Sequence, residues 1–264
     1  MRRFLIPLLA LPLALSNYDS CHAETPAKPP SKTARVFIDS KAKAILERAA
    51  KLYGSKLRWS GKVALSTEDS KKVSIAFERP KKVAIEQKGE GEYRLIVTDG
   101  QREAEYSNGA AGESIGDTML SRSIEEILVT SSSTSAPDTG IVPVLARLLN
   151  GKTGLSGREY EEKTHGATSV TVKQLSDTIW KGQKCQRVAT DIRFSPAYDL
   201  DLTQYHEELW LSPDGKLLKV IGFKLIKADN GVPADKWNDE MLAQNFAPKF
   251  GPKTFVFSPP QTKK

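Results

Sequence analysis

The chain has 264 residues, of which 39% are hydrophobic and 27% charged, and its formal net charge is +7. This length supports one large domain, or at most two small ones, with a hydrophobic core of its own. The Lys and Arg residues are scattered and mixed with Asp and Glu, whereas a nucleic-acid-binding protein gathers them on one element with aromatic residues between them. The composition therefore argues against a nucleic-acid partner.

The first 23 residues have the features of a secretory signal. Arg2 and Arg3 form a basic start, residues 4–15 an apolar stretch, and Cys21-His22-Ala23 a small-x-small cleavage site. The apolar stretch is shorter than the roughly 20 residues that span a bilayer, and no stop-transfer segment follows it. We predict cleavage after Ala23 and a periplasmic mature protein without a transmembrane segment.

The two cysteines fit this interpretation. Tyr18 stands three positions before Cys21, where a lipoprotein signal places Leu or a similar residue, which argues against lipid anchoring at Cys21. Cleavage after Ala23 leaves Cys185 alone, so no internal disulfide is expected. Because Cys185 lies in an apolar stretch of a predicted strand and has no Cys-x-x-Cys partner, we expect an inert core thiol rather than a redox group.

The N-terminal part of the mature chain is predicted to be a flexible lead followed by a helix. Residues 24–36 are rich in Pro, Lys and Thr, and residues 37–260 are expected to form a single domain with 261–264 as a tail. Asp39 or Ser40 is a suitable N-cap and Gly54 a suitable stop. The apolar residues between them recur at helical spacing: Ala42, Ile45, Leu46, Ala49, Leu52 and Tyr53.

The period then falls to two, which predicts an antiparallel meander of about five strands. An Asp99-Gly100 pair marks one of its turns. The expected strands cover residues 57–65, 73–78, 83–85, 93–97 and 102–107.

Helical spacing returns between residues 114 and 150. A first helix is expected around Leu120 to Leu128, and a second over Ile141 to Leu149, ending at Asn150-Gly151. Residues 131–139 are predicted to form a polar loop between them.

Strands are predicted again after Gly157, with a type I turn at Ser212-Pro213-Asp214-Gly215. Residues 227–240 are interpreted as a polar excursion and 255–257 as a short closing strand. The other expected strands cover residues 159–163, 169–175, 178–180, 184–194, 204–211 and 216–226.

The order helix, strands, two helices, strands excludes a doubly wound parallel sheet and predicts an α+β domain. A sheet of about ten antiparallel strands tends to curve strongly, with the helices on its concave face. The concave interior is then either a packed core or a ligand cavity. The candidate cavity-wall residues are Trp59, Val63, Leu65, Ile75, Phe77, Leu145, Trp210 and Phe223.

Sequence motifs for chemistry are missing. His165 and His206 are the two histidines of the mature chain, and they stand in no metal-binding spacing. There is no Gly-x-Ser-x-Gly motif and no glycine-rich phosphate loop after a strand. We therefore expect no metal, no cofactor and no enzymatic activity.

Several short motifs occur in a familiar order over residues 37–260. They are Phe77-Glu78-Arg79-Pro80, Asp99-Gly100, Gly182-x-x-Cys185, Glu208-Leu209-Trp210-Leu211-Ser212-Pro213-Asp214-Gly215 and Phe255-Val256-Phe257-Ser258-Pro259-Pro260. In this order the chain resembles a family of periplasmic proteins with the LolA/LolB-like fold. The resemblance implies an unclosed eleven-stranded half-barrel whose helices lid a cavity for acyl chains of lipoproteins or lipids, and it implies no enzyme activity.

Two functions stay open at this point. One is a periplasmic carrier that holds a lipid-like ligand or a lipoprotein acyl chain in the cavity, driven by apolar burial. The other is a protein-interaction module of the cell envelope that has the same fold with a filled core and docks through a sheet edge or through residues 227–240.

Overall fold

The computed structural model describes residues 34–66, 71–89, 91–109, 112–119, 122–123, 126–128, 139–195, 202–227, 231–233 and 235–258. They belong to the larger of two compact units, Thr33–Lys264. The predicted leader with its cleavage site and Cys21, nearly all of the lead, the loop 131–138 and the tail 261–264 lie outside them, so these assignments stay predictions.

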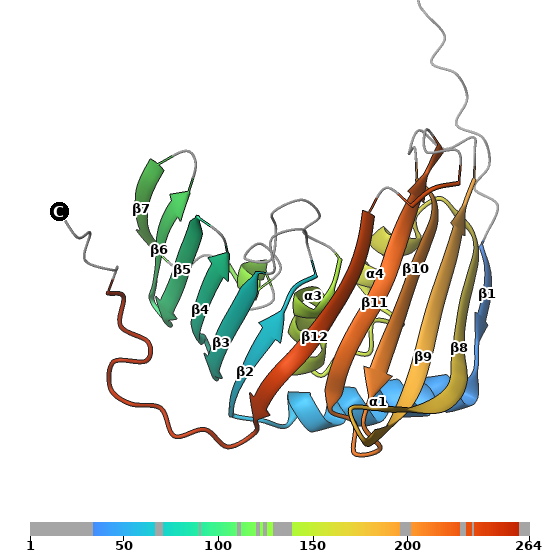
Figure 1. Cartoon of the computed structure of the whole chain (residues 1–264), viewed down its shortest axis with the longest axis horizontal. Helices are drawn as coiled ribbons and strands as arrows, with labels where there is room; N and C mark the ends of the chain where they lie inside the picture. Colours follow the sequence, from blue (N-terminus) through green and yellow to red (C-terminus); the bar gives the residue numbers. More distant parts are fainter. Residues whose placement is uncertain are drawn as a thin grey trace, which may run out of the picture. The chain divides into compact units, whose positions relative to one another are not determined.

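A single twelve-stranded sheet holds the described residues together (Figure 1). Its strand order is β1-β8-β9-β10-β11-β12-β2-β3-β4-β5-β6-β7. The strands are β1 (Arg35–Ile38), β2 (Arg58–Ala64), β3 (Lys72–Glu78), β4 (Lys82–Gly89), β5 (Glu92–Asp99), β6 (Arg102–Gly109), β7 (Gly112–Met119), β8 (Ala167–Trp180), β9 (Gln183–Phe194), β10 (Leu202–Leu211), β11 (Leu217–Ile226) and β12 (Asp235–Asn245).

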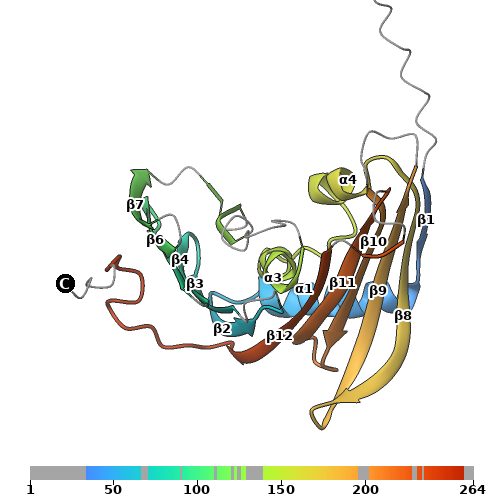
Figure 2. The same cartoon turned by 45° about the horizontal axis from the view of Figure 1, so that its top comes forward.

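Three helices, α1 (Ser40–Gly54), α3 (Ile141–Leu149) and α4 (Arg158–Thr164), lie on the concave face of the curved sheet (Figure 2). The Asp39 side chain caps α1 by accepting a 3.0 Å hydrogen bond from the Lys41 backbone N–H, as the sequence predicted. Residues 250–258 run along the opposite, convex face (Figure 2). We call these two sides of the sheet the inner and the outer face.

The fold class agrees with the prediction: an unclosed, curved, mainly antiparallel sheet with helices on its concave face. It differs in one edge, because β1 pairs with β8 in parallel, from Arg35 opposite Ser169 to Ile38 opposite Val172. The sheet is therefore mixed and has twelve strands rather than ten or eleven. A four-residue strand next to a Pro-rich segment has no periodicity long enough to recognise.

Four local predictions are wrong. Residues 112–119 form strand β7 where a helix was expected to start, and Arg158–Thr164 is helix α4 rather than a strand. The supposed polar excursion contains most of β12, and residues 255–257 form no strand. Glu and Lys, which are good helix formers, favour a helix in α4. In β12, the buried residues Trp237, Asp239 and Met241 alternate with more exposed ones, but the charged Asp239 hides this pattern in the sequence.

Candidate functional site

The predicted cavity-wall residues do not share one face. Six of them are buried in the core between the inner face and the helices: Trp59, Val63, Leu65, Ile75, Phe77 and Leu145. The other two, Trp210 and Phe223, lie on the outer face, because Leu209 and Val220 occupy the inward positions of β10 and β11. There Arg187 stacks 5.0 Å from the Trp210 ring, and His206 stacks 5.0 Å from Phe223.

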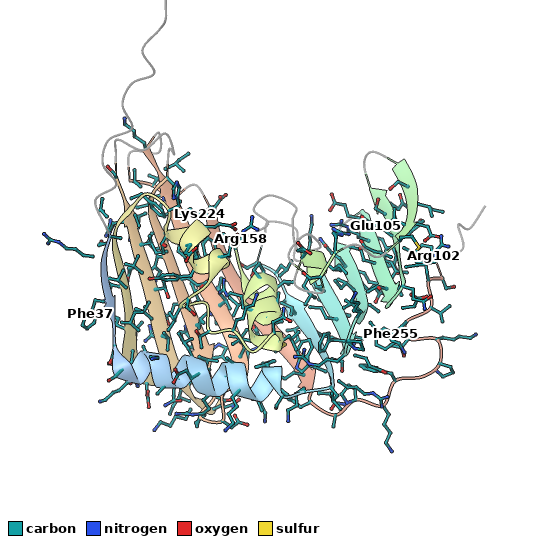
Figure 3. All side chains as sticks on the ribbon, turned by 180° about the vertical axis from the view of Figure 1, so that it is seen from behind. Phe37, Arg102, Glu105, Arg158, Lys224 and Phe255 are labelled. Atoms are coloured by element: carbon teal, nitrogen blue, oxygen red, sulfur yellow. The ribbon has the colours of Figure 1, made fainter. Side chains whose placement is uncertain are left out.

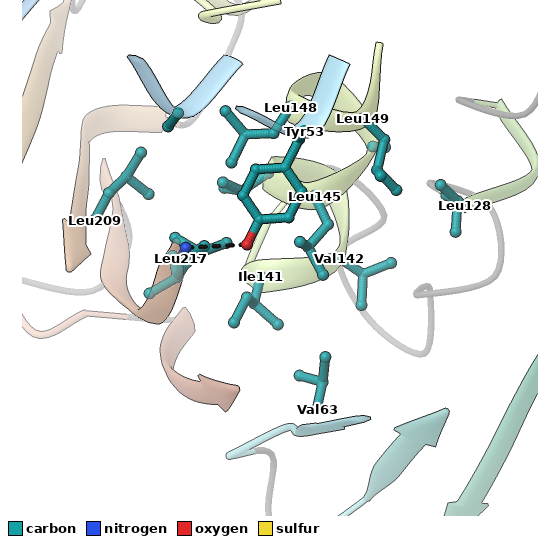
Figure 4. Packing of buried hydrophobic residues seen from close by; sticks show 14 of the residues in the cluster. Tyr53, Val63, Leu128, Ile141, Val142, Leu145, Leu148, Leu149, Leu209 and Leu217 are labelled. Atoms are coloured by element: carbon teal, nitrogen blue, oxygen red, sulfur yellow. Dashed lines mark hydrogen bonds between the residues drawn. The ribbon is translucent and has the colours of Figure 1, made fainter. Parts of the chain in front are cut away.

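Helix α1 is fixed to the sheet by Tyr53 (Figure 4). Its hydroxyl donates to Gln244 Oε1 at 2.6 Å and accepts from the Leu217 backbone N–H at 3.0 Å. Gln244 in turn donates to the Leu217 carbonyl at 3.0 Å. Because Tyr53 is fully buried, desolvation raises the pKa of its hydroxyl above the usual value, and the hydroxyl stays neutral.

Helix α3 is fixed at both ends. Asp239 of β12 accepts from the Ile141 N–H at 2.9 Å and from the Ser66 N–H at 3.0 Å, which caps a helix start that has no side-chain cap of its own. At the other end, Arg79 donates to the carbonyls of Leu149 and Gly54. The arginine of the Phe77-Glu78-Arg79-Pro80 motif thus joins the C-terminal ends of α3 and α1, where a cation is favoured.

A buried ionic cluster lies under α4. Glu207 of β10 contacts Arg147 of α3 at 3.3 Å and Lys163 of α4 at 3.5 Å, and it accepts from the Tyr205 hydroxyl at 2.7 Å. Burial raises the pKa of Glu207, but Lys163 and Arg147 outweigh burial and hold that pKa below its usual range. The carboxylate therefore stays ionised and ties α3 and α4 to the sheet.

The cavity beside this cluster is small. It has a volume of about 20 Å³ and is lined by Leu46, Arg147, Tyr160, Lys163 and Ile192, among others. That volume suits about one water molecule, for which the Tyr160 hydroxyl, buried without a hydrogen-bond partner in the described part of the chain, is a ready donor. Around α1, α3 and α4 the described side chains thus pack closely.

Strands β3–β7, which we call the limb, are covered differently. Helices α1 and α3 make their main sheet contacts with β8, β9, β11 and β12. On the inner face of the limb, Val83, Ile85 and Ile96 are nevertheless at most 2% exposed. They belong to the one hydrophobic core of the described residues, which also includes Ile127, Leu128 and the buried side chains of α1 and α3.

Arg122, Ser123 and residues 126–128 form what we call the cover segment. Arg122 pairs with the buried Glu103 of β6, with Nε to Oε2 at 3.1 Å. Ser123 and Glu126 form a reciprocal capping box, with the Ser123 N–H to Glu126 Oε2 at 2.6 Å and the Glu126 N–H to Ser123 Oγ at 3.2 Å. Among the described residues, the cover segment is therefore a locally capped helical start that contacts the limb through the Arg122–Glu103 ion pair.

Two buried polar atoms on the inner face of β2 and β4 lack hydrogen-bond partners among the described residues: Trp59 Nε1 and Gln87 Oε1. A buried polar group without a partner costs about 1–3 kcal/mol, and native proteins contain few. One donor and one acceptor are thus available beside the apolar side chains.

The outer face carries a larger concavity. A groove of about 380 Å³ crosses β2–β5 beside the end of β12. Its floor includes the small side chains of Ser60, Ser74, Ala76 and Ala84. In the alternating pattern of the strands, these positions stand on the side away from the core. Their shared small size, on three adjacent strands, was the signal that could have revealed the groove.

The residues that could support chemistry are not arranged for it in the described part of the chain. His206 pairs with Asp191 at 2.7 Å on the outer face, and no group of three His, Cys, Asp or Glu residues there could hold a metal ion. Cys185 is buried, and desolvation raises the pKa of its thiol, so the thiolate is disfavoured. None of the described helices has the length and apolar character to cross a membrane.

These features define a LolA/LolB-like fold: a curved, unclosed sheet with helices on its concave face. Among solved structures the chain is similar to MucB, with 13% identity over 83% of this chain and 64% of that chain and a TM-score of 0.39. It is also similar to LprF from Mycobacterium bovis, with 10% identity over 81% and 97% and a TM-score of 0.42.

The lipoprotein LppX from Mycobacterium tuberculosis is a third similar structure, with 9% identity over 80% of this chain and 98% of that chain and a TM-score of 0.37. The chain thus spans just under two thirds of the length of MucB. No protein-family model matches the sequence, and no curated protein does.

Proposed function

We propose that the protein is an exported, non-enzymatic carrier that holds a lipid-like ligand between the limb and the cover segment. The main observation for this proposal is the way in which the inner face of the limb is covered. Its apolar inner positions, Val83, Ile85 and Ile96, are buried, and among the described residues the cover segment contacts the limb through the Arg122–Glu103 ion pair. Displacing the cover segment would expose these apolar side chains.

The energetics favour an acyl chain at this site. Apolar surface contributes about 25 cal/mol per Å² when it is removed from water, so a chain that replaces Ile127 and Leu128 on Val83, Ile85 and Ile96 keeps that surface dry. A polar head group could satisfy either Trp59 Nε1 or Gln87 Oε1. Four of the predicted wall residues lie on β2 and on the adjacent limb strand β3: Trp59, Val63, Ile75 and Phe77.

A specific observation favours the second candidate, a protein-interaction module of the cell envelope. The enclosed cavity found under the described helices has a volume of only about 20 Å³, as a filled core would give. The two functions differ in whether the limb can take up a ligand at all.

Native mass spectrometry of protein purified from the periplasm of an expressing bacterium, together with titration by a fluorescent fatty acid, tests the carrier. We expect bound lipid, and we expect Arg122→Gln/Leu128→Ala to release the fluorescent fatty acid at least about 5-fold faster, because the cover segment opens more often. Val36→Ala, at an exposed position of β1, is the matched control. An absence of both bound lipid and uptake would reject the carrier and leave the interaction module.

A further inference from the structure

The groove on the outer face is built by small side chains. Ser60 of β2, Ser74 and Ala76 of β3 and Ala84 of β4 all point outward, and Leu95 of β5 lines it at the limb side. Medium-sized side chains at these positions would fill the space. The result is an open trough of about 380 Å³ on the face opposite the helices.

The neighbouring strip of the same face is already covered by the protein's own C-terminal segment, whose Phe255 is labelled in Figure 3. Phe250 and Phe255 lie beside Glu78 and Lys82, and Lys82 Nζ is 6.0 Å from the centre of the Phe255 ring. Residues 252–255 form turns, with the Thr254 N–H bonded to the Gly251 carbonyl, so the segment binds through side chains rather than through a ladder. The outer face therefore accepts aromatic side chains of an irregular peptide segment.

Three polar side chains of the groove, Lys62, Ser60 and Ser74, have no hydrogen-bond or ion-pair partner among the described residues. Glu86, the acidic residue of the rim, is already engaged by Lys88 at 2.9 Å and by the Tyr93 hydroxyl at 3.1 Å. The unpaired charge at the rim is therefore positive.

We propose that the groove docks an apolar segment of a partner protein that carries an acidic residue. Small apolar or aromatic side chains would fill the trough, as the phenylalanines do on the adjacent strip. The Ser60 and Ser74 hydroxyls would form hydrogen bonds with the peptide backbone, whereas an acyl chain has no groups that could form them. Lys62 would pair with the carboxylate of the acidic residue. This site lies on the other face from the ligand site proposed above and does not depend on it.

A displayed library of ten-residue peptides, selected on the mature protein and counter-selected on Ala84→Trp, tests the proposal. Ala84 points outward, so the tryptophan fills the groove and leaves the core intact, which circular dichroism and fatty-acid uptake can check. We expect selected peptides to contain Asp or Glu among apolar residues and to bind Ala84→Trp at least about 10-fold more weakly.

Charge reversal makes the test specific. Lys62→Glu should weaken binding of a selected peptide at least about 10-fold, and replacing the acidic residue of that peptide by Lys should restore it. Lys51→Glu, at an exposed position of α1, is the matched control. The proposal is overturned if no peptide is enriched against Ala84→Trp, if Lys62→Glu has no effect, or if a fatty acid displaces the peptides, since the groove would then bind an acyl chain.

Discussion

Strands β8–β12 and the limb strands β3–β5 both bury apolar side chains on the inner face, but these side chains are covered in different ways. Over β8–β12, helices α1, α3 and α4 are each joined to strands by buried polar groups, such as Tyr53, Asp239 and Glu207. Over the limb, the cover segment has the partly exposed Arg122 ion pair and two apolar side chains.

The difference indicates which contacts can be exchanged for a ligand. A buried polar bond that is broken leaves an unsatisfied group, whereas an apolar contact can be replaced by another apolar surface at little cost. Under the carrier proposal, strands β8–β12 keep their helices in place and the limb exchanges its cover. The four predictions below test this contrast, from the largest expected effect to the smallest.

Glu207→Gln should lower the free energy of unfolding by about 3–5 kcal/mol, because it leaves Arg147 and Lys163 buried without their carboxylate. Urea denaturation followed by circular dichroism measures this loss. Glu161→Gln on the exposed side of α4 should change stability by less than about 0.5 kcal/mol. Equal effects of the two substitutions would mean that the cluster does not fix the helices.

Tyr53→Phe should cost about 1–3 kcal/mol, because the Leu217 N–H and Gln244 Oε1 lose a buried partner. Tyr93→Phe removes a comparable hydroxyl bond to Glu86 on the outer face of the limb, at a half-buried position, and should cost under about 1 kcal/mol. Thermal unfolding of the pair compares the two regions directly. A larger loss for Tyr93→Phe would contradict the contrast.

Two buried carboxyl groups should give opposite pH responses. Glu207 has a lowered pKa, so its stabilisation is present above its usual value of 4.5 and is lost as the pH falls through the folded-state pKa. Burial raises the pKa of Asp239, against its two backbone N–H bonds, so its ionisation destabilises the fold as the pH rises above 3.8.

Denaturation of variants between pH 3 and pH 7 separates the two groups. The destabilisation by Glu207→Gln should shrink towards low pH, and that by Asp239→Asn should shrink towards high pH. Parallel pH dependences would show that one of the two assignments is incorrect.

The smallest effect concerns the cover segment. Arg122→Gln removes an ion pair between an arginine that is 33% exposed and a carboxylate that is 7% exposed. Because the arginine side is open to water, we expect a cost of about 1 kcal/mol, so amide exchange in the limb should rise about 5-fold. Exchange in α1 should not change. Hydrogen-exchange mass spectrometry measures both regions in one experiment, with Arg58→Gln as a surface ion-pair control. Equal acceleration in α1 would mean that the two covers open together.

The sequence predicted the fold class and the elements with long periodic patterns. Helix α1 with its Asp39 cap and helix α3 are where expected, and so are most central strands. Strand β7 was missed because residues 114–119 are exposed on both faces, so no buried side marks the strand. The faces of Trp210 and Phe223 could not be assigned, because alternation alone does not say which set of side chains meets the helices.

The candidate sites depended on information that no single segment contains. Arg147, Lys163 and Glu207 come from two helices and a strand, and only the strand order brings them together. The groove depends on outward positions of three strands being small at once. By contrast, Arg79 was marked by its motif, but its two helix contacts required the structure.

The position of β12 affects how the chain can fold as it is made. This strand lies between β11 and β2, so it is the connection between the limb and the rest of the sheet. The limb strands end at Met119, whereas β12 begins only at Asp235. Helix α1 packs on β8 and β9, which are also synthesised much later than the helix. Contacts between residues so far apart in the sequence make folding slow. Until β12 has been synthesised, a nascent chain cannot join the limb to the rest of the sheet. We therefore expect the protein to fold late and as a unit, and chains that end before Asp235 to leave the limb detached.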